Sequence, residues 1–313
     1  MKSSLDEMRR GEAEFFNQSA HRRTAYGQIP MEADIRRATR FQPTSPDQES
    51  IDPRMTRILE GYFRDRFIDY VAHRPAGRVL DIGCGPGWLA LELGRRGQTV
   101  DAYDLSPEAI SLARRMLSEN PYRDGFGRVT YHLEDATQLD FGNETLDAVS
   151  GWSAFHHLPG LPGFMDRIHR ALKPGGIVAT MDDLPCGGLE RSLRWGLRFL
   201  LPIYQRTYAQ KLVYAISYIR GKVAAPVQVF TPMELVAEKH TAAVHDIRSI
   251  WRERFELLWA VQFDAFATGV CMSLTGPDCF RYALGRAITG LDRLLCKTGI
   301  CEGTYQILVA RKK

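Results

Sequence analysis

A glycine-rich turn that directly follows a short apolar segment constrains this chain most. The apolar segment is Val79–Ile82, and the turn Gly83–Gly87 carries a glycine at every second position. Glycine adopts dihedral angles that other residues avoid, and it lets a bulky group approach the backbone closely. The pattern predicts a buried strand whose end turns sharply against a nucleotide-like ligand.

Strand and helix patterns alternate on both sides of this turn. A helix over residues 54–73 leads into the first strand, because its apolar residues recur at spacings of three and four. Strands that alternate with helices form a parallel sheet covered on both faces, so we expect an α/β fold. The expected strands are residues 78–82, 99–104, 129–133, 146–151, 177–181, 255–263 and 304–310.

The chain is expected to divide into four segments. An N-terminal arm or lid, with a helix over Asp6–Ala20 that carries Phe15 and Phe16, is followed by a core, a helical substrate cap and C-terminal strands that complete the sheet. Their expected bounds are 1–55, 56–183, 184–245 and 246–313, with a helical insertion at 278–297.

Composition excludes several classes of protein. A formal net charge of +4 is too small to indicate nucleic-acid binding by itself, and no RNA-binding module is recognisable. The six cysteines form no C-x-x-C pair, which favours reduced thiols in a cytoplasmic protein over a disulfide framework or a metal site. The first residues lack the apolar core of a signal peptide.

Three acidic positions indicate the kind of ligand. Asp81 would repel a pyrophosphate but hold a cationic group, and Asp104, at the end of the second strand, can accept both hydroxyls of a ribose. Asp135 follows the third strand and suits the exocyclic amine of adenine. Ribose, adenine and a cationic tail without phosphate describe S-adenosylmethionine. The G-x-G-x-G spacing also differs from the G-x-G-x-x-G of dinucleotide-binding proteins, which disfavours a nicotinamide oxidoreductase.

At these residues the chain resembles the class I S-adenosylmethionine-dependent methyltransferases. The resemblance covers about residues 75–183 and the two C-terminal strands, and it implies a Rossmann-like, mostly parallel seven-stranded sheet with an antiparallel last strand. The pattern of this chain itself predicts helical insertions after strand five and before the last strand. The motifs that carry it are Val79–Gly87, Asp104–Pro107, Glu134–Ala136, Asp147–Val149 with Phe155–Leu158, and Leu172–Gly176.

The same resemblance assigns cofactor-binding residues. Asp81 and the glycine turn lie near the methionine moiety, Asp104 holds the ribose, and Leu105 packs on the adenine ring. Asp135 and Ala136 lie at the adenine amine, while Gly151 and Trp152 border the cofactor and the substrate mouth. The turn residues included in this assignment are Gly83, Cys84, Gly85 and Gly87.

Two pairs of residues are candidates for catalysis. His156 and His157 follow the fourth strand, and Asp182 and Asp183 end the fifth, so all four are expected at the carboxyl edge of the sheet where ligands bind. Transfer of a methyl group from a sulfonium mainly requires alignment, and a hydroxyl acceptor also needs a base. The structural alternatives are that the histidines begin a helix and that the aspartates cap a turn.

The acceptor is expected to depend on the additions to the core. Residues 190–222 are aromatic and basic, which suits an apolar acceptor, an anionic acceptor or peripheral contact with a membrane; the alternative is a solvated basic face over an aromatic core. We expect methyl transfer to a small-molecule, lipid or glycolipid acceptor, at a hydroxyl oxygen. Carbon or nitrogen methylation of a metabolite and a non-catalytic cofactor-binding protein are the alternatives.

Overall fold

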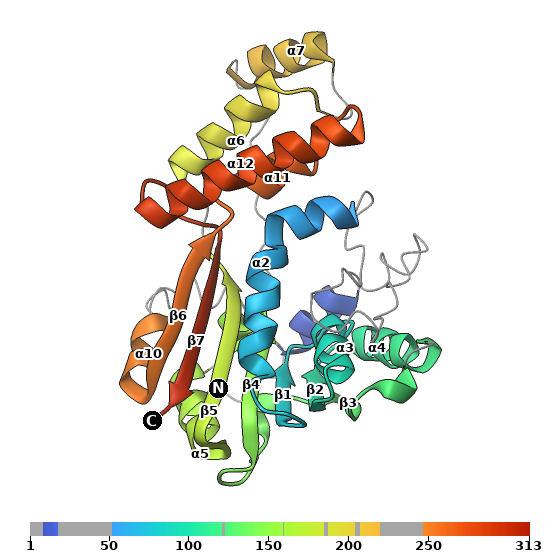
Figure 1. The fold of residues 1–313 in the computed structure, drawn as a ribbon, viewed down its shortest axis with the longest axis vertical. Helices are drawn as coiled ribbons and strands as arrows, with labels where there is room; N and C mark the ends of the chain where they lie inside the picture. Colours follow the sequence, from blue (N-terminus) through green and yellow to red (C-terminus); the bar gives the residue numbers. More distant parts are fainter. Residues whose placement is uncertain are drawn as a thin grey trace.

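A seven-stranded sheet forms the centre of the molecule (Figure 1). The structure is a computed structural model that describes residues 9–17, 52–120, 123–158, 160–184, 187–203, 207–219 and 247–313. The strand order is β3-β2-β1-β4-β5-β7-β6, and β7 runs antiparallel to both of its neighbours. This order confirms the expected Rossmann-like α/β fold. The strands are β1 (Arg78–Ile82), β2 (Thr99–Asp104), β3 (Val129–Leu133), β4 (Leu146–Trp152), β5 (Leu172–Asp183), β6 (Phe255–Phe263) and β7 (Tyr305–Lys312).

Helices surround the sheet and extend beyond it. An N-terminal helix covers residues 9–17. Residues 6–8 and 18–20 of the expected helix lie outside the described part of the chain, as do residues 220–222 of the basic region. The other helices are α2 (Pro53–Val71), α3 (Trp88–Arg95), α4 (Pro107–Glu119), α5 (Leu161–Ala171), α6 (Gly188–Leu200), α7 (Tyr208–Ile219), α10 (Ile247–Arg254), α11 (Ala267–Cys271) and α12 (Asp278–Thr298).

Side chains of successive strand residues point to opposite faces of the sheet, as strand geometry requires. Val79 and Ala148 belong to the apolar cluster formed with α2, α3 and α4, whereas Leu80 and Val149 belong to the cluster formed with α5 and α10. Trp251 of α10 is completely buried in the second cluster. The two central strands are therefore covered on both sides, which leaves ligands access mainly at the strand ends.

Strand β5 is longer than its sequence predicts. The expected strand begins at residue 177, but Leu172 already pairs with Leu146 of β4, and the register shifts before Ala148 pairs with Ile177. The irregularity accommodates the proline and glycines of this stretch without ending the strand.

Helices α10 and α11 were not predicted.

A third apolar cluster lies above the sheet. It joins the first half of α2 to α6, α11 and α12, through residues such as Met55, Leu193 and Val270. We call α6, α7, α11 and α12 the upper helices. Figure 1 shows them beyond the upper ends of β5 and β6.

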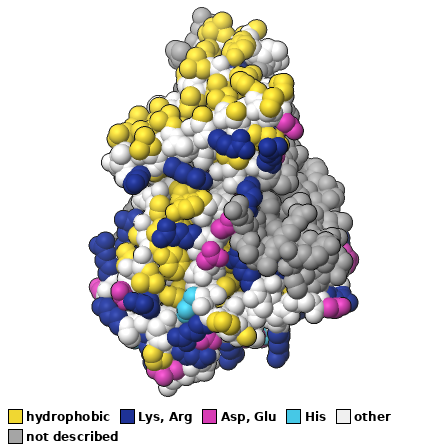
Figure 2. All heavy atoms as spheres, viewed as in Figure 1, with side chains coloured by type: hydrophobic (Ala, Val, Ile, Leu, Met, Phe, Trp, Pro, Cys, Tyr) yellow, Lys and Arg dark blue, Asp and Glu magenta, His cyan; other side chains and the backbone are white. Residues whose placement is uncertain are grey.

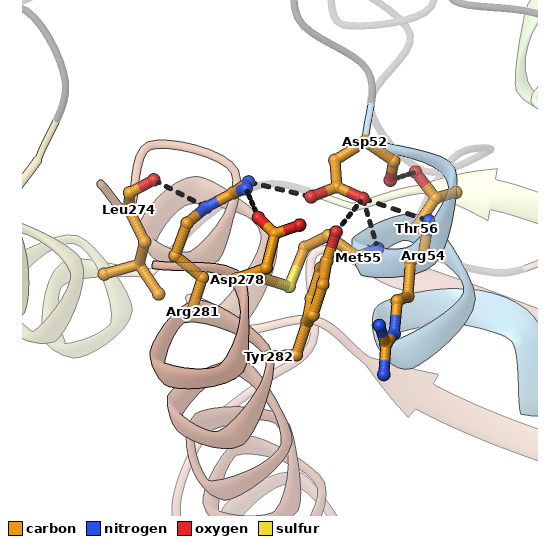
Figure 3. Close-up of polar contacts among 8 residues, drawn as sticks. All are labelled: Asp52, Arg54, Met55, Thr56, Leu274, Asp278, Arg281 and Tyr282. Carbon is orange, nitrogen blue, oxygen red and sulfur yellow. Dashed lines mark hydrogen bonds and ion pairs between the residues drawn. The ribbon is translucent and has the colours of Figure 1, made fainter. Parts of the chain in front are cut away.

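A polar cluster holds the upper helices to α2 (Figure 3). Asp52 accepts hydrogen bonds from the backbone nitrogens of Arg54 and Met55, each at 3.1 Å, and so caps α2. The same carboxylate pairs with Arg281 at 2.8 Å and accepts a hydrogen bond from the Tyr282 hydroxyl at 3.1 Å. One side chain thus fixes both the start of α2 and its contact with α12.

Candidate functional site

The glycine turn after β1 leaves an open space beside a buried acid. A Cβ atom added at Gly87 would come within 2.5 Å of the Tyr131 hydroxyl, so this position requires glycine. A Cβ atom at Gly85 would meet no atom within 4 Å, which shows that the turn is open there. Gly83 and Cys84 complete the turn; the thiol is buried, and burial raises its pKa well above the usual range.

Asp81 lies beneath this turn and is almost completely buried. The Ser150 hydroxyl donates to its Oδ1 at 3.1 Å, while its buried Oδ2 has no hydrogen-bond partner among the described residues. Burial raises the pKa of Asp81 to about 8, and the nearby charge of Asp104 acts in the same direction. A buried, unsatisfied carboxylate oxygen calls for a donor, and a cationic donor satisfies it best.

Asp104 connects the glycine turn to the end of β2. Its Oδ2 accepts a hydrogen bond from the Gly85 nitrogen and its Oδ1 accepts one from the Ser106 nitrogen, each at 2.8 Å. A carboxylate has about four acceptor positions, so both oxygens can still receive ribose hydroxyls. Burial raises the pKa of Asp104 despite these backbone donors. Leu105 follows it, half-buried, at the start of the loop that leads to α4.

Asp135 begins a short 3-10 turn after β3 and contacts the N-terminal helix. Its Oδ1 accepts hydrogen bonds from the nitrogen and the hydroxyl of Thr137, and its Oδ2 pairs with Arg9 at 2.8 Å. Ala136 beside it is buried. The predicted adenine position is therefore next to a basic side chain that sequence reasoning did not identify, because no local pattern links residues 9 and 135.

Two further contacts bring the N-terminal helix to the candidate site. Glu12, which is buried, lies 2.9 Å from Nδ1 of His157, and the Asn17 side chain accepts a hydrogen bond from the Ser106 hydroxyl at 2.7 Å. The ring of Phe16 meets His157 edge-on, with centroids 5.7 Å apart. The helix thus lies over the ends of β2, β3 and β4.

His156 contacts the ring of His157, with centroids 4.0 Å apart, and it joins the two aspartates of β5. Its Nδ1 lies 2.9 Å from Oδ1 of Asp182, and its Nε2 lies 3.7 Å from Oδ2 of Asp183. Thr180 and Ser153 donate hydrogen bonds to Asp182 and Asp183, respectively. Burial raises the pKa of Asp183 above its usual range. Of the four predicted candidates, His156, Asp182 and Asp183 form one group, and His157 also contacts the N-terminal helix.

An arginine and two tryptophans lie together next to the glycine turn. Trp152 ends β4 and meets Trp88 edge-on, with ring centroids 5.1 Å apart. The guanidinium of Arg64, on α2, lies 4.4 Å and 4.6 Å from the centroids of these two rings and pairs with Glu60 at 2.6 Å. Gly151 precedes Trp152, and a Cβ atom there would collide with the Phe155 ring at 2.6 Å. Sequence reasoning missed Arg64, since α2 reads only as an amphipathic helix.

These residues fit S-adenosylmethionine. The unsatisfied Oδ2 of Asp81 suits the amino group of the methionine moiety, and Arg64 adds a cation that suits its carboxylate. The open turn at Gly85 admits a bulky group, and Asp104 and Asp135 offer acceptors at the ends of the next two strands.

Comparison with known proteins agrees with this site. Residues 79–176 match the family model of a methyltransferase domain. A demethylmenaquinone methyltransferase of Symbiobacterium thermophilum is 28% identical over 157 residues, which cover 44% of this chain and 61% of that protein. A ubiquinone biosynthesis O-methyltransferase of Xanthomonas campestris is 33% identical over 124 residues, which cover 38% of this chain and 50% of that protein.

Among solved structures, an S-adenosylmethionine-dependent methyltransferase from Mesorhizobium loti aligns with 81% of this chain and 98% of its own, at 16% identity and a TM-score of 0.46. The chain spans between half and about three-fifths of the length of the two curated relatives named above.

The sheet order, the glycine turn and the family match define a cofactor-binding methyltransferase domain. This part of the chain is a methyltransferase domain of the class I S-adenosylmethionine-dependent type, and its site fits S-adenosylmethionine as the methyl donor.

Proposed function

We propose that this protein transfers a methyl group from S-adenosylmethionine to a hydroxyl oxygen of a small, lipid-like acceptor. The observation that carries the proposal is the pairing of His156 with Asp182 at the carboxyl edge of the sheet, where the glycine turn also lies. In this proposal the core of residues 56–183 binds the cofactor, and the segment of residues 184–245 helps to select the acceptor.

The chain's own residues would supply orientation and a base. When bound, S-adenosylmethionine provides a methyl group already activated by its sulfonium. In this proposal Nδ1–H of His156 donates to Asp182, which fixes the tautomer in which Nε2 is the basic nitrogen that takes the proton of an acceptor hydroxyl. Asp183, 3.7 Å from Nε2, would stabilise the imidazolium that forms. Trp88 and Trp152 form an aromatic wall next to the glycine turn, which suits a flat apolar acceptor.

The names of two relatives support an acceptor of this kind. One is named for demethylmenaquinone, and the other is an O-methyltransferase of ubiquinone biosynthesis. Both names refer to quinones, which are flat rings with an apolar tail, and an acceptor of that shape suits the aromatic wall of this site. Transfer to oxygen is the chemistry for which a histidine base is useful.

Release of S-adenosylhomocysteine tests this proposal. The full chain is incubated with S-adenosylmethionine and hydroxylated aromatic lipids, and mass spectrometry locates the added methyl group. We expect O-methylated product from the wild-type protein and a large loss of product with His156→Gln. Products methylated only at carbon or nitrogen, or cofactor binding without transfer to any acceptor in the panel, would contradict it.

A further inference from the structure

Helix α7 exposes a continuous apolar stripe. Tyr208, Leu212, Val213 and Ile216 are 58%, 53%, 64% and 40% exposed, and their spacing of four, five and eight residues places them on one side of the helix. The opposite side carries Lys211, which is buried and donates hydrogen bonds to carbonyl oxygens at the end of α6. Tyr208 also contributes to this attachment, since its hydroxyl donates to the Leu200 oxygen at 2.9 Å, whereas Leu212, Val213 and Ile216 present apolar side chains to solvent.

Helix α6 adds a basic and aromatic face. Arg191, Trp195 and Arg198 are all exposed and follow one another at spacings of four and three, which places the tryptophan between the two arginines. Its indole stacks on Phe199, with ring centroids 5.7 Å apart. Within the described parts of α6 and α7 the one acidic residue is Glu190, which is buried and accepts a hydrogen bond from the Glu302 nitrogen.

The apolar and basic side chains occupy the same end of the molecule. Figure 2 shows hydrophobic side chains gathered at the top, where Figure 1 places α7, with Lys and Arg side chains in a band beneath them. An apolar surface bordered by arginines and an amphipathic tryptophan matches the layers of an anionic lipid surface, in which charged headgroups lie outside acyl chains. No helix in the described part of the chain is long and apolar enough to cross a bilayer.

We propose that the stripe on α7 and the Arg191–Trp195–Arg198 face of α6, together the docking face, bind the surface of an anionic lipid bilayer. A second copy of the chain is a weaker partner for this face, since a symmetric contact would bring the same arginines together. A lipid surface supplies the opposite charge instead.

The docking face is connected to the candidate site. Arg194 of α6 donates a hydrogen bond to the Ala265 oxygen, at 3.1 Å, just beyond the end of β6, and α6 begins five residues after Asp183. Docking would therefore hold the carboxyl edge of the sheet near the bilayer. The role of docking, which is to bring the site to a lipid-borne acceptor, rests on the proposed function. The binding of the docking face to a bilayer does not.

Vesicle flotation of the full chain tests this inference without any methyl transfer. Phosphatidylcholine vesicles are compared with vesicles that also contain phosphatidylglycerol. We expect the protein to float with the anionic vesicles and to be released by added salt. Replacing Arg191 and Arg198 by Gln should weaken partitioning about fivefold for each arginine. Recovery of the wild-type protein only in the unbound fraction would overturn the inference, whether or not the protein is an active methyltransferase.

A matched pair of variants locates the surface. Leu212→Glu introduces a charge into the stripe and should abolish flotation, whereas Leu291→Glu, at a similarly exposed leucine of α12, should float as the wild type does. Both should keep wild-type circular dichroism. Equal loss of flotation in both variants would contradict the assignment to α6 and α7. A wild-type dimer that does not float, and that Leu212→Glu converts to a monomer, would identify the face as an interface between copies.

Discussion

Nδ1 of His156 lies 2.9 Å from Oδ1 of Asp182, and both residues are buried at the carboxyl edge of the sheet. The same oxygen accepts the backbone N–H of His156 at 3.1 Å, and Thr180 donates to Oδ2 at 2.6 Å. Three donors thus converge on Asp182, which makes it a positioning residue for the imidazole.

His156→Gln should lower kcat by roughly 10²- to 10⁴-fold, because the base is lost while the cofactor residues stay in place. Asp182→Asn should lower it too, since an amide can present its N–H to Nδ1 and favour the wrong tautomer. Steady-state kinetics and calorimetric titration with S-adenosylhomocysteine separate turnover from cofactor binding. His157→Gln is the control, with a smaller effect on kcat; if it removed turnover and His156→Gln did not, the two roles would be reversed.

Asp81→Asn should change how stability depends on pH. Burial raises the pKa of Asp81 to about 8, so the folded protein retains a proton there that the unfolded chain loses above about pH 4. The stability of the cofactor-free protein should therefore fall as the pH rises toward 8, by about 1.4 kcal/mol per pH unit at most. The variant should lose this slope in thermal unfolding, whereas Asp124→Asn, at a fully exposed side chain, should keep it.

Binding of the cofactor should release a proton from Asp81. A cationic amino group beside the carboxylate favours its ionised form and lowers its pKa again. Calorimetric titration near pH 7 in buffers of different ionisation enthalpy measures this release. The wild-type protein should release up to about one proton on binding and Asp81→Asn none, with much weaker affinity. Equal proton release by both proteins would show that Asp81 does not meet the cation.

Glu12→Gln should speed the release of bound cofactor. The substitution weakens the contact with His157 that holds the N-terminal helix over the strand ends, and the loss of one hydrogen bond to a charged group, about 1.5 kcal/mol, corresponds to roughly tenfold. Stopped-flow displacement of S-adenosylhomocysteine measures the rate. Glu14→Gln, at an exposed position of the same helix, is the matched control. Unchanged release from Glu12→Gln would mean that the helix does not act as a lid.

Asp52→Ala should destabilise the protein by about 2–3 kcal/mol, since it removes both the cap of α2 and the pair with Arg281. Chemical denaturation measures the change. Asp278→Asn is the control because that side chain is 70% exposed in its own pair with Arg281, so its loss should cost less than about 0.5 kcal/mol. A loss for Asp52→Ala no larger than that for Asp278→Asn would mean that neither the cap nor the ion pair of Asp52 stabilises the protein.

The seven strands and most of the helices could be predicted because their signals are local. These signals are apolar alternation, a proline at the start of α4 and the glycines after β1. Each depends on a few neighbouring residues and predicts the same local structure whatever the rest of the chain. Helix α10 was missed: it has one fully buried residue, Trp251, among several charged ones, so its pattern is weak.

The fold class and the methyl donor could be read from the sequence, because the glycine turn and the acids that indicate S-adenosylmethionine lie next to the predicted strand ends. Which of these residues contact one another depends on the tertiary structure. His156 and Asp182 meet because β4 and β5 are neighbours in the sheet, and Arg9 reaches Asp135 because the chain folds back across the strand ends. Such contacts between distant residues depend on the closure of the whole sheet, which no local pattern encodes.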